Sequence, residues 1–325
     1  MDKQLQLQVK ILKLQFGQRL DQALAELFPD HSRSQIKKWI LDKKVQVNGK
    51  IINRPKEKVF GNEQIDINVL LEEDMRWQPQ NIPLNIVYED DEIIVINKPC
   101  DLVVHPGAGN LDGTILNALL YHYPEIINVP RAGIVHRLDK DTTGLMVIAK
   151  TIAAQTHLVQ SLQLRKIARE YEAIVNGCMT AGGMINEPIA RHPTKRTHMA
   201  IHTSGKPAIT YYRIMEHFRI HTRLKLRLES GRTHQIRVHM AHINHPLVGD
   251  PVYGDRSCTL KGVSKEFCQI MDNFNRQALH ATKLRLYHPC TGIEMEWHAD
   301  IPEDIIILIN MLKADSVMHK DEMDW

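Results

Sequence analysis

The chain has 325 residues, of which 43% are hydrophobic and 24% are charged, and this globular composition excludes disordered, collagenous and fibrous proteins. No stretch approaches the roughly 20 apolar residues that a membrane helix needs, and the alternating N-terminus lacks the apolar core of a signal peptide. The net charge of +3 is too small to indicate a nucleic-acid partner by itself, and the length predicts two domains.

The N-terminal part is predicted to form a compact basic unit, with 13 basic against 8 acidic residues over 1–70. Apolar residues at helical spacing predict a helix over 18–28. A capping-box pattern that starts at Ser32 predicts a second helix over 33–41. An Asn48-Gly49 turn between two short apolar runs predicts a β-hairpin.

These elements resemble, in their order, the S4 RNA-binding domain. The matching stretches are RLDQALAELFPDHSRSQIKKWI and VQVNGK. The resemblance implies that residues 1–75 bind RNA, with Arg33, Lys37 and Lys38 of the second helix as contacts. The alternative is a generic small α/β domain. One departure is Phe60-Gly61-Asn62, where S4 domains usually carry a second glycine or an aspartate.

The next stretch, residues 71–92, is acidic, with seven acidic residues against one basic residue, and it contains the predicted linker 76–84. Two β-rich runs around an acidic turn at 89–92 then predict a hairpin that opens a second domain, residues 85–315. Later strands are expected at 132–135, 145–149, 170–176, 209–214, 222–229 and 283–287. Helices are expected at 112–122, 151–163, 233–243 and 302–313. This pattern predicts an α+β fold with a mixed, largely antiparallel sheet, followed by a frayed polar tail in the last dozen residues, 316–325 lying beyond the second domain.

The densest polar segment is HRLDKDTTGL, residues 136–145, between two predicted buried strands. A carboxylate on such a loop is held rigidly and remains open to a ligand. Asp139 and Asp141 are therefore candidates for an acid, a base or a nucleophile. The alternative is that both residues only stabilise the turn.

This segment resembles the HRLDxxTSG signature of the RluA-type pseudouridine synthases, with Thr143 where serine is common. Other matching stretches are INKPCDLVVHPGAG, REYEAIV, GRTHQIRVHMAHINHPLVGDPVYG and ALHATKLRLYHP. The preceding S4 domain narrows the resemblance to the D-type enzymes of this family. The resemblance implies isomerisation of specific uridines to pseudouridine in large-subunit ribosomal RNA, with the helix 69 stem-loop as the expected target.

The resemblance also implies the roles of individual residues. Asp139 corresponds to the essential aspartate, acting as nucleophile or as base at the sugar. Tyr171 corresponds to the active-site tyrosine that packs on the target base. Arg237 corresponds to the basic partner of the aspartate, and Arg232 is its competitor in the same segment. Arg137 corresponds to the arginine that enters the RNA stack where the target base leaves it.

Further RNA contacts are expected from Arg232 and from Lys195 and Arg196 in the basic segment 160–240, which carries 14 basic against 5 acidic residues. No metal or cofactor is expected. The histidines at positions 234, 239, 242 and 245 have no acidic or cysteine partner at ligand spacing. Gly107-Ala108-Gly109 lacks the third glycine of a dinucleotide fingerprint. Five cysteines without a C-x-x-C pair indicate a reducing cytoplasm.

Two other functions use the same features. One is a noncatalytic RNA-binding protein that acts in ribosome assembly, and it has no need of an ionised, partnered Asp139. The other is an RNA hydrolase or glycosidase, which predicts a second functional acid, and Asp141 is the near candidate. The expected partner in the favoured interpretation is large-subunit ribosomal RNA or the assembling subunit, bound by a monomer without membrane association.

Overall fold

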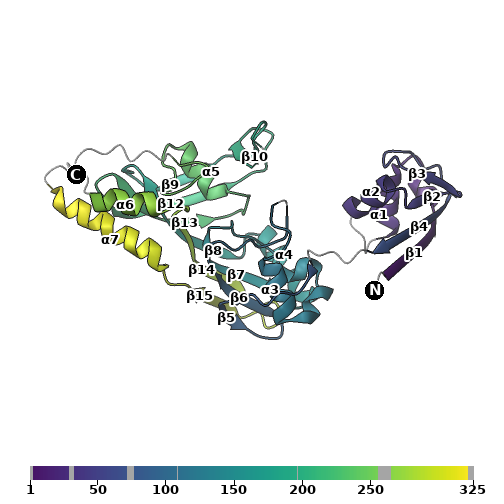
Figure 1. The fold of residues 1–325 in the computed structure, drawn as a ribbon, viewed down its shortest axis with the longest axis horizontal. Coiled ribbons are helices and arrows are strands. Elements are labelled where there is room, and N and C mark those ends of the chain that lie inside the picture. Colours follow the sequence, from purple (N-terminus) through teal and green to yellow (C-terminus); the bar gives the residue numbers. More distant parts are fainter. Residues whose placement is uncertain are drawn as a thin grey trace. The chain divides into compact units, whose positions relative to one another are not determined.

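The computed structural model describes residues 3–28, 33–71, 77–107, 109–195, 197–254 and 265–320. The chain divides into two compact units, residues 1–75 and 76–325 (Figure 1). Within the described ranges, no helix combines the length and the apolar character needed to cross a membrane.

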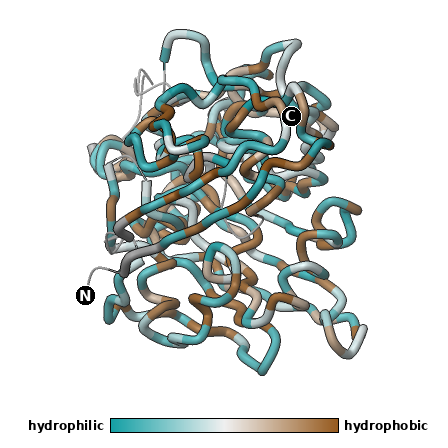
Figure 2. Tube along the Cα trace, turned by 90° about the vertical axis from the view of Figure 1, so that its right-hand side faces the viewer, coloured by the Kyte–Doolittle hydropathy of each residue, from teal (hydrophilic) through white to brown (hydrophobic). Residues whose placement is uncertain are grey.

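The first unit is an antiparallel sheet of order β1-β4-β2-β3 together with two helices. Its elements are β1 Lys3–Lys10, η1 Lys13–Gln15, α1 Leu20–Leu27, α2 Arg33–Leu41, β2 Val45–Val47, β3 Lys50–Ile52 and β4 Gln64–Leu71. Both expected helices and the hairpin are present. The sequence analysis did not predict strands β1 and β4, which pair with each other along their whole length. Hydrophobic and hydrophilic residues alternate along the strands next to the N-terminus (Figure 2).

Local chemistry explains the turns of this unit. Asn48 and Gly49 have φ angles of 50° and 77°, as a type I′ hairpin turn requires. Helix α1 begins two residues later than expected because Arg19 forms a β-bridge with Lys58. Ser32 lies outside the described residues, so its predicted role as the cap of α2 stays a prediction.

The second unit is built on a sheet of order β5-β6-β7-β14-β8-β13-β12-β9, with β15 paired to β14. Its strands are β5 Ile86–Glu89, β6 Ile93–Lys98, β7 Thr143–Ala149, β8 Ala168–Asn176, β9 Gly183–Asn186, β12 Ile209–His217, β13 His221–Leu228, β14 Leu279–Tyr287 and β15 Glu294–His298. Strands β7 and β14 run parallel, and the other pairings are antiparallel. The predicted α+β fold with a mixed, largely antiparallel sheet is confirmed.

Helices cover both faces of this sheet. The helical elements are α3 Ile115–His122, η3 Pro124–Asn128, η4 Pro130–Gly133, α4 Ile152–Gln163, α5 Gln235–His242, α6 Lys265–Asn273 and α7 Glu303–Met318. Alternate residues of β6 serve two cores: Ile94 and Ile96 pack with α3, whereas Ile93 and Val95 pack with α4. A separate hairpin, β10 Ile189–Arg191 with β11 Met199–Ile201, extends beyond α5 (Figure 1).

The strand expected at 132–135 is absent, and that expectation is wrong. The chain instead makes the 3₁₀ turn η4, in which Arg131 and Ala132 have φ angles of 55° and 49°. A Cβ on Gly133 would lie 1.8 Å from the Ala149 carbonyl oxygen, so only glycine allows the chain to cross the end of β7 so closely. Beyond it, Ile134 makes a single β-bridge with Ile148.

The polar tail also begins later than expected, because α7 continues to Met318. Asp315 forms a buried ion pair with Arg219, Oδ2 to Nε at 3.1 Å. The hydroxyl of Ser316 accepts a hydrogen bond from the Arg219 backbone N–H at 2.9 Å. These two contacts hold the last turns of α7 in place. The polar composition of residues 314–318 therefore did not indicate the end of the helix.

Candidate active site

A cavity of about 630 Å³ opens beside Asp139 in the second unit. Its apolar wall includes Leu138, Tyr171 and Leu279. Its charged lining carries two acidic residues, Asp139 and Glu229, and six arginines, at positions 131, 137, 165, 169, 232 and 237. A concave surface with such an excess of cations attracts a polyanion.

Asp139 lies in the turn between the extended segment after η4 and strand β7. Its carbonyl oxygen accepts a hydrogen bond from the Thr142 N–H at 3.1 Å, which closes the turn. The buried Lys98 donates to the Lys140 carbonyl at 2.7 Å and to the Leu102 carbonyl at 2.9 Å, tying the turn to the end of β6. The aspartate is therefore mounted on a rigid loop.

Arg237 links two aspartates. Its Nη1 donates to Asp139 Oδ2 at 3.1 Å, and its Nε and Nη2 donate to Asp250 at 2.7 and 2.8 Å. Burial disfavours the charged form of Arg237, but the hydrogen bonds and charges of Asp250 and Asp139 outweigh it and raise the pKa of the guanidinium. Burial of Asp250 is likewise outweighed by Arg237, which lowers the pKa of that carboxyl. The result is a permanently charged donor aimed at Asp139.

His234 approaches Asp139 from the start of α5. Its Nε2 lies 3.9 Å from Asp139 Oδ1, and its Nδ1 lies 2.8 Å from the Tyr253 hydroxyl oxygen. That hydroxyl also accepts a hydrogen bond from the Met199 N–H at 2.7 Å, which fixes its position beside His234. Burial lowers the pKa of His234, despite the opposing charge of Asp139.

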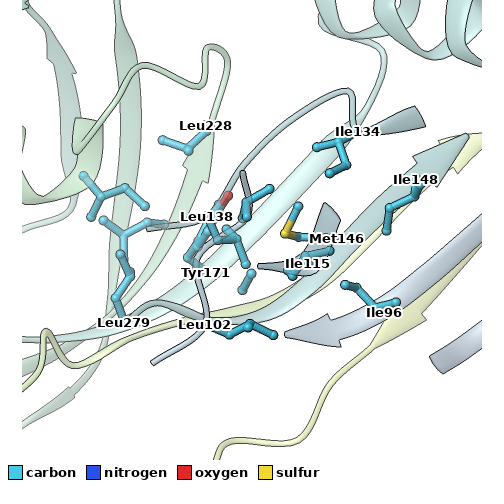
Figure 3. Packing of buried hydrophobic residues seen from close by; sticks show 14 of the residues in the cluster. Ile96, Leu102, Ile115, Ile134, Leu138, Met146, Ile148, Tyr171, Leu228 and Leu279 are labelled. Atoms are coloured by element: carbon cyan, nitrogen blue, oxygen red, sulfur yellow. The ribbon is translucent and has the colours of Figure 1, made fainter. Parts of the chain in front are cut away.

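Tyr171 is on β8, in the apolar wall of the cavity. Its side chain is 5% exposed and belongs to the same buried cluster as Leu138, Leu228 and Leu279 (Figure 3). Burial raises the pKa of its hydroxyl, and the charge of Arg169 only partly opposes this effect. Tyr171 is therefore a neutral phenol at pH 7, with its ring fixed by packing.

The structure places the other sequence-predicted residues in different surroundings. Arg137 is exposed at the cavity, and Arg232 lines it while donating from Nε to the Pro207 carbonyl at 3.2 Å. Lys195 lies on the exposed loop between β10 and β11, outside the cavity lining. Arg196 lies outside the described residues.

In the first unit, Lys37 and Lys38 are exposed on α2. Arg33 instead donates to the buried carboxylate of Asp21 at 2.9 Å, which Arg19 also contacts at 2.9 Å. Its guanidinium is therefore engaged in holding α1 to α2, although 47% of the side chain remains exposed.

Asp141, the alternative acid, and the clustered histidines His239 and His245 make their contacts away from Asp139. Asp141 lies outside the cavity lining and accepts a weak hydrogen bond from the Cys100 thiol at 3.9 Å. His239 contacts Thr210 and the Glu187 carbonyl, and His245 contacts the Asn176 carbonyl. In the part of the chain that the structure describes, no group of three or more His, Cys, Asp or Glu side chains could hold a metal.

Sequence reasoning missed Asp250, Tyr253 and Arg169 as parts of this site. The first two stand in GDPVYG, within a quoted stretch of family resemblance, and a carboxylate beside a tight turn was a usable signal. Asp250 both caps this turn, accepting from the Val252 and Tyr253 N–H groups, and holds Arg237.

Known protein families match both units of the chain. Residues 92–242 match the RNA pseudouridylate synthase family, and residues 18–65 match the S4 domain. Relatives called ribosomal large subunit pseudouridine synthase D are 68% identical in Escherichia coli (strain K12) and 69% in Yersinia pestis, each over 325 residues and 100% of both chains. The one from Pasteurella multocida is 65% identical over 322 residues, 99% of both chains.

Solved structures show the same fold in the catalytic unit. Human RNA pseudouridylate synthase domain containing 1 has a TM-score of 0.53 and 26% identity, covering 72% of this chain and 96% of that one. Human RNA pseudouridylate synthase domain containing 4 has a TM-score of 0.54 and 23% identity, covering 70% and 93%.

Proposed function

Because the chain belongs to the RNA pseudouridylate synthase family and is an isomerase, we propose that it converts specific uridines of large-subunit ribosomal RNA to pseudouridine, with Asp139 as the catalytic residue. The observation that carries the assignment to Asp139 is its ion pair with Arg237 inside an arginine-lined cavity. Full-length relatives called ribosomal large subunit pseudouridine synthase D support the choice of substrate.

The reaction breaks the N1–C1′ bond of uridine and joins C1′ to C5 of the same base. Asp139 acts at the sugar, as nucleophile or as base, and the hydrogen bond from its partner Arg237 holds the carboxylate in position. The detached uracil stays in the cavity and turns, so that C5 faces the sugar. All atoms of the product come from the substrate, and the chemistry consumes no co-substrate.

Tyr171 packs on the uracil and relays the proton that leaves C5, directly or through a water. As a neutral phenol it gives up its own hydrogen when it accepts another, so it serves as a relay rather than as a strong base. The apolar wall around it, including Leu138 and Leu279, keeps bulk water from the sugar. This exclusion favours rejoining of the base over hydrolysis.

The target uridine must leave the RNA stack to reach Asp139. Arg137, exposed at the cavity, fills the place that the base vacates. Arg232 at the cavity and Lys195 on the β10–β11 loop bind phosphates, and Arg196 is assigned to the same role by sequence alone. In the first unit, Lys37 and Lys38 of α2, together with Arg33, bind the RNA at a second place.

We assign the helix 69 stem-loop as the target, modified by a monomer in the cytoplasm, on ribosomal RNA or on the assembling subunit. The domain bounds that go with this function are an RNA-binding unit of residues 1–75, a linker of 76–84 and a catalytic unit that begins at residue 85. The match of residues 18–65 to the S4 domain supports the first of these.

Tritium release from helix 69 RNA labelled at uracil C5 tests the function. Wild type should release tritium without freeing uracil, and Asp139→Asn should lose at least a thousandfold in rate. Asp141→Asn, two residues away and outside the cavity lining, is the matched control and should retain most activity. No release by wild type would refute helix 69 as the target, free uracil would indicate a hydrolase, and an active Asp139→Asn would refute the catalytic assignment.

A further inference from the structure

Arg169 is a buried cation, and among the described residues none forms an ion pair with it. Its side chain is 7% exposed, and its Nε has no hydrogen-bond partner. The other arginine side chains that are equally buried in the described ranges are each paired with an aspartate within 3.1 Å: Arg219 with Asp315, Arg237 with Asp250 and Arg276 with Asp304. A guanidinium removed from water at such a cost is normally paired. Since no described residue supplies this anion, the partner of Arg169 is expected in a bound ligand.

The position of Arg169 indicates where that partner lies. Arg169 lines the cavity that contains Asp139 and Tyr171. It precedes Tyr171 by two residues on β8, so both side chains project from the same face, about 6.5–7 Å apart along the strand. An anion that pairs with Arg169 would therefore lie in the same cavity as a group that packs on Tyr171.

Gly231 completes the site. A Cβ at this position would lie 2.7 Å from Arg169 Nη1, so the absence of a side chain is what allows the guanidinium to lie against this loop. The loop itself is exposed, and it leads to Arg232. The guanidinium thus lies between a buried strand and an open rim, where an anion can reach it.

We propose that Arg169 and the Gly231 loop form a subsite for one phosphate of the RNA, the one attached to the ribose of the target uridine. The proposal rests on the proposed function, because phosphates are the anions of an RNA substrate. The contact fixes the nucleotide with its base on Tyr171 and its C1′ beside Asp139. The bound phosphate also compensates the charge of the buried guanidinium. The RNA is therefore bound more tightly when the target nucleotide is correctly placed in the cavity.

Two variants separate this role from a structural one. Arg169→Met removes a charge that has no partner in the free protein, so its thermal midpoint should be unchanged or higher; a structural arginine would lower it. Gly231→Ala keeps the charge and displaces the guanidinium, which is the flexible end of a side chain. Arg223→Met is the matched control, because Arg223 lies outside the cavity lining and is paired with Glu172.

The decisive measurement is equilibrium binding of a fluorescent helix 69 stem-loop by the full-length protein over a range of salt concentrations. Arg169→Met should bind about ten- to hundredfold more weakly, and the slope of log K against log salt should shrink by about one. Gly231→Ala should shift both quantities in the same direction, and Arg223→Met should change affinity less than threefold. Equal affinity and slope for Arg169→Met and wild type would overturn the proposal.

A methylphosphonate at the target nucleotide locates the contact. Wild type should lose affinity for this RNA, whereas Arg169→Met should lose little more, because both changes remove the same interaction. Additive losses would overturn the assignment to that phosphate. Conversion of the unmodified stem-loop, followed in parallel with wild type, tests the proposed function separately, since the binding cycle gives its answer whether or not the RNA is converted.

Discussion

Asp250 accepts two hydrogen bonds from Arg237, at 2.7 and 2.8 Å, with a side chain that is completely buried. The pair leaves only Nη1 of the guanidinium for Asp139, at 3.1 Å. The buried aspartate thus acts as a fixed anchor, and the cavity-facing one can engage a substrate. We infer that Asp250 positions Asp139, the proposed catalytic residue.

Asp250→Asn should therefore lower kcat about 10–100-fold, because a small displacement of Arg237 misaims Asp139. RNA affinity should change less than threefold, since Asp250 has no exposed surface on which RNA could bind. The measurement is a single-turnover rate together with a binding isotherm on the same stem-loop. An unchanged kcat would refute the positioning role.

Asp315→Asn provides the control for Asp250→Asn. Asp315 pairs with Arg219 in a similarly buried ion pair, but on α7 and outside the cavity lining. This variant should lose stability, by about 1–3 kcal/mol, and keep its kcat at temperatures where it remains folded. A fall in kcat equal to that of Asp250→Asn would show that lost stability alone explains both.

Tyr171→Phe should separate packing from proton transfer. The ring remains, so RNA affinity should change less than threefold, while loss of the hydroxyl should lower kcat at least 100-fold. Tyr212→Phe is the matched control, because Tyr212 packs against the same cluster from β12 without lining the cavity. Full activity of Tyr171→Phe would exclude the hydroxyl from the reaction.

Buried histidines should make the protein acid-sensitive. Burial lowers the pKa of four of them to values of about 4, 3, 4 and 4, for His105, His136, His221 and His280 respectively. In the unfolded chain histidines titrate near 6.5, so unfolding takes up protons between about pH 6.5 and pH 4. The free energy of unfolding is therefore highest above pH 6.5 and falls as the pH is lowered through this window.

Urea unfolding at pH 7, 6 and 5 measures this effect. Each neutral buried histidine contributes a slope of up to about 1.4 kcal/mol per pH unit. His221→Phe, which keeps a ring against Phe267, should remove the contribution of one histidine. Equal stabilities at pH 7 and 5 would contradict the assignment of these rings as neutral.

Gly144→Ala should disrupt the loop that carries Asp139. Gly144 has a φ of 113°, and a Cβ there would lie 2.3 Å from the Ala281 carbonyl oxygen, where β7 meets β14. The clash is with backbone, so we expect a loss of about 3 kcal/mol or more in urea unfolding. Gly292→Ala, with a φ of 68° and open space around it, should cost only about 1 kcal/mol. Equal losses would indicate backbone strain rather than close packing.

Lys37→Ala with Lys38→Ala should weaken binding to long ribosomal RNA more than to the isolated stem-loop. The two side chains are exposed on α2, and their removal should reduce the salt slope by about two. Lys313→Ala, which removes an exposed lysine paired with Glu216 in the other unit, should leave the slope unchanged. An identical loss on both RNAs would contradict a separate grip by the first unit.

Local signals in the sequence determined much of this protein. The hairpin at Asn48-Gly49, helices α2 to α5 and the strand β7 that follows Asp139 could be predicted from periodicity, caps and turn residues, which act over a few positions. The HRLDKDTTGL segment, with its family resemblance, singled out Asp139. None of these inferences required knowledge of which distant segments meet.

The tertiary structure decided the rest. Strand β1 pairs with β4, about 60 residues away in the sequence. At Gly133 the chain passes close to the end of β7 and does not form the expected strand. The last turns of α7 are held by the ion pair between Asp315 and Arg219. The ion pair that joins Asp139 to Arg237 spans 98 residues. The isolation of Arg169 is likewise a property of everything around it. The burial of a charged side chain and its pairing with an opposite charge depend on segments that are far apart in the sequence. Only the folded chain therefore shows which charged side chains are paired within the protein and which are free to bind a ligand.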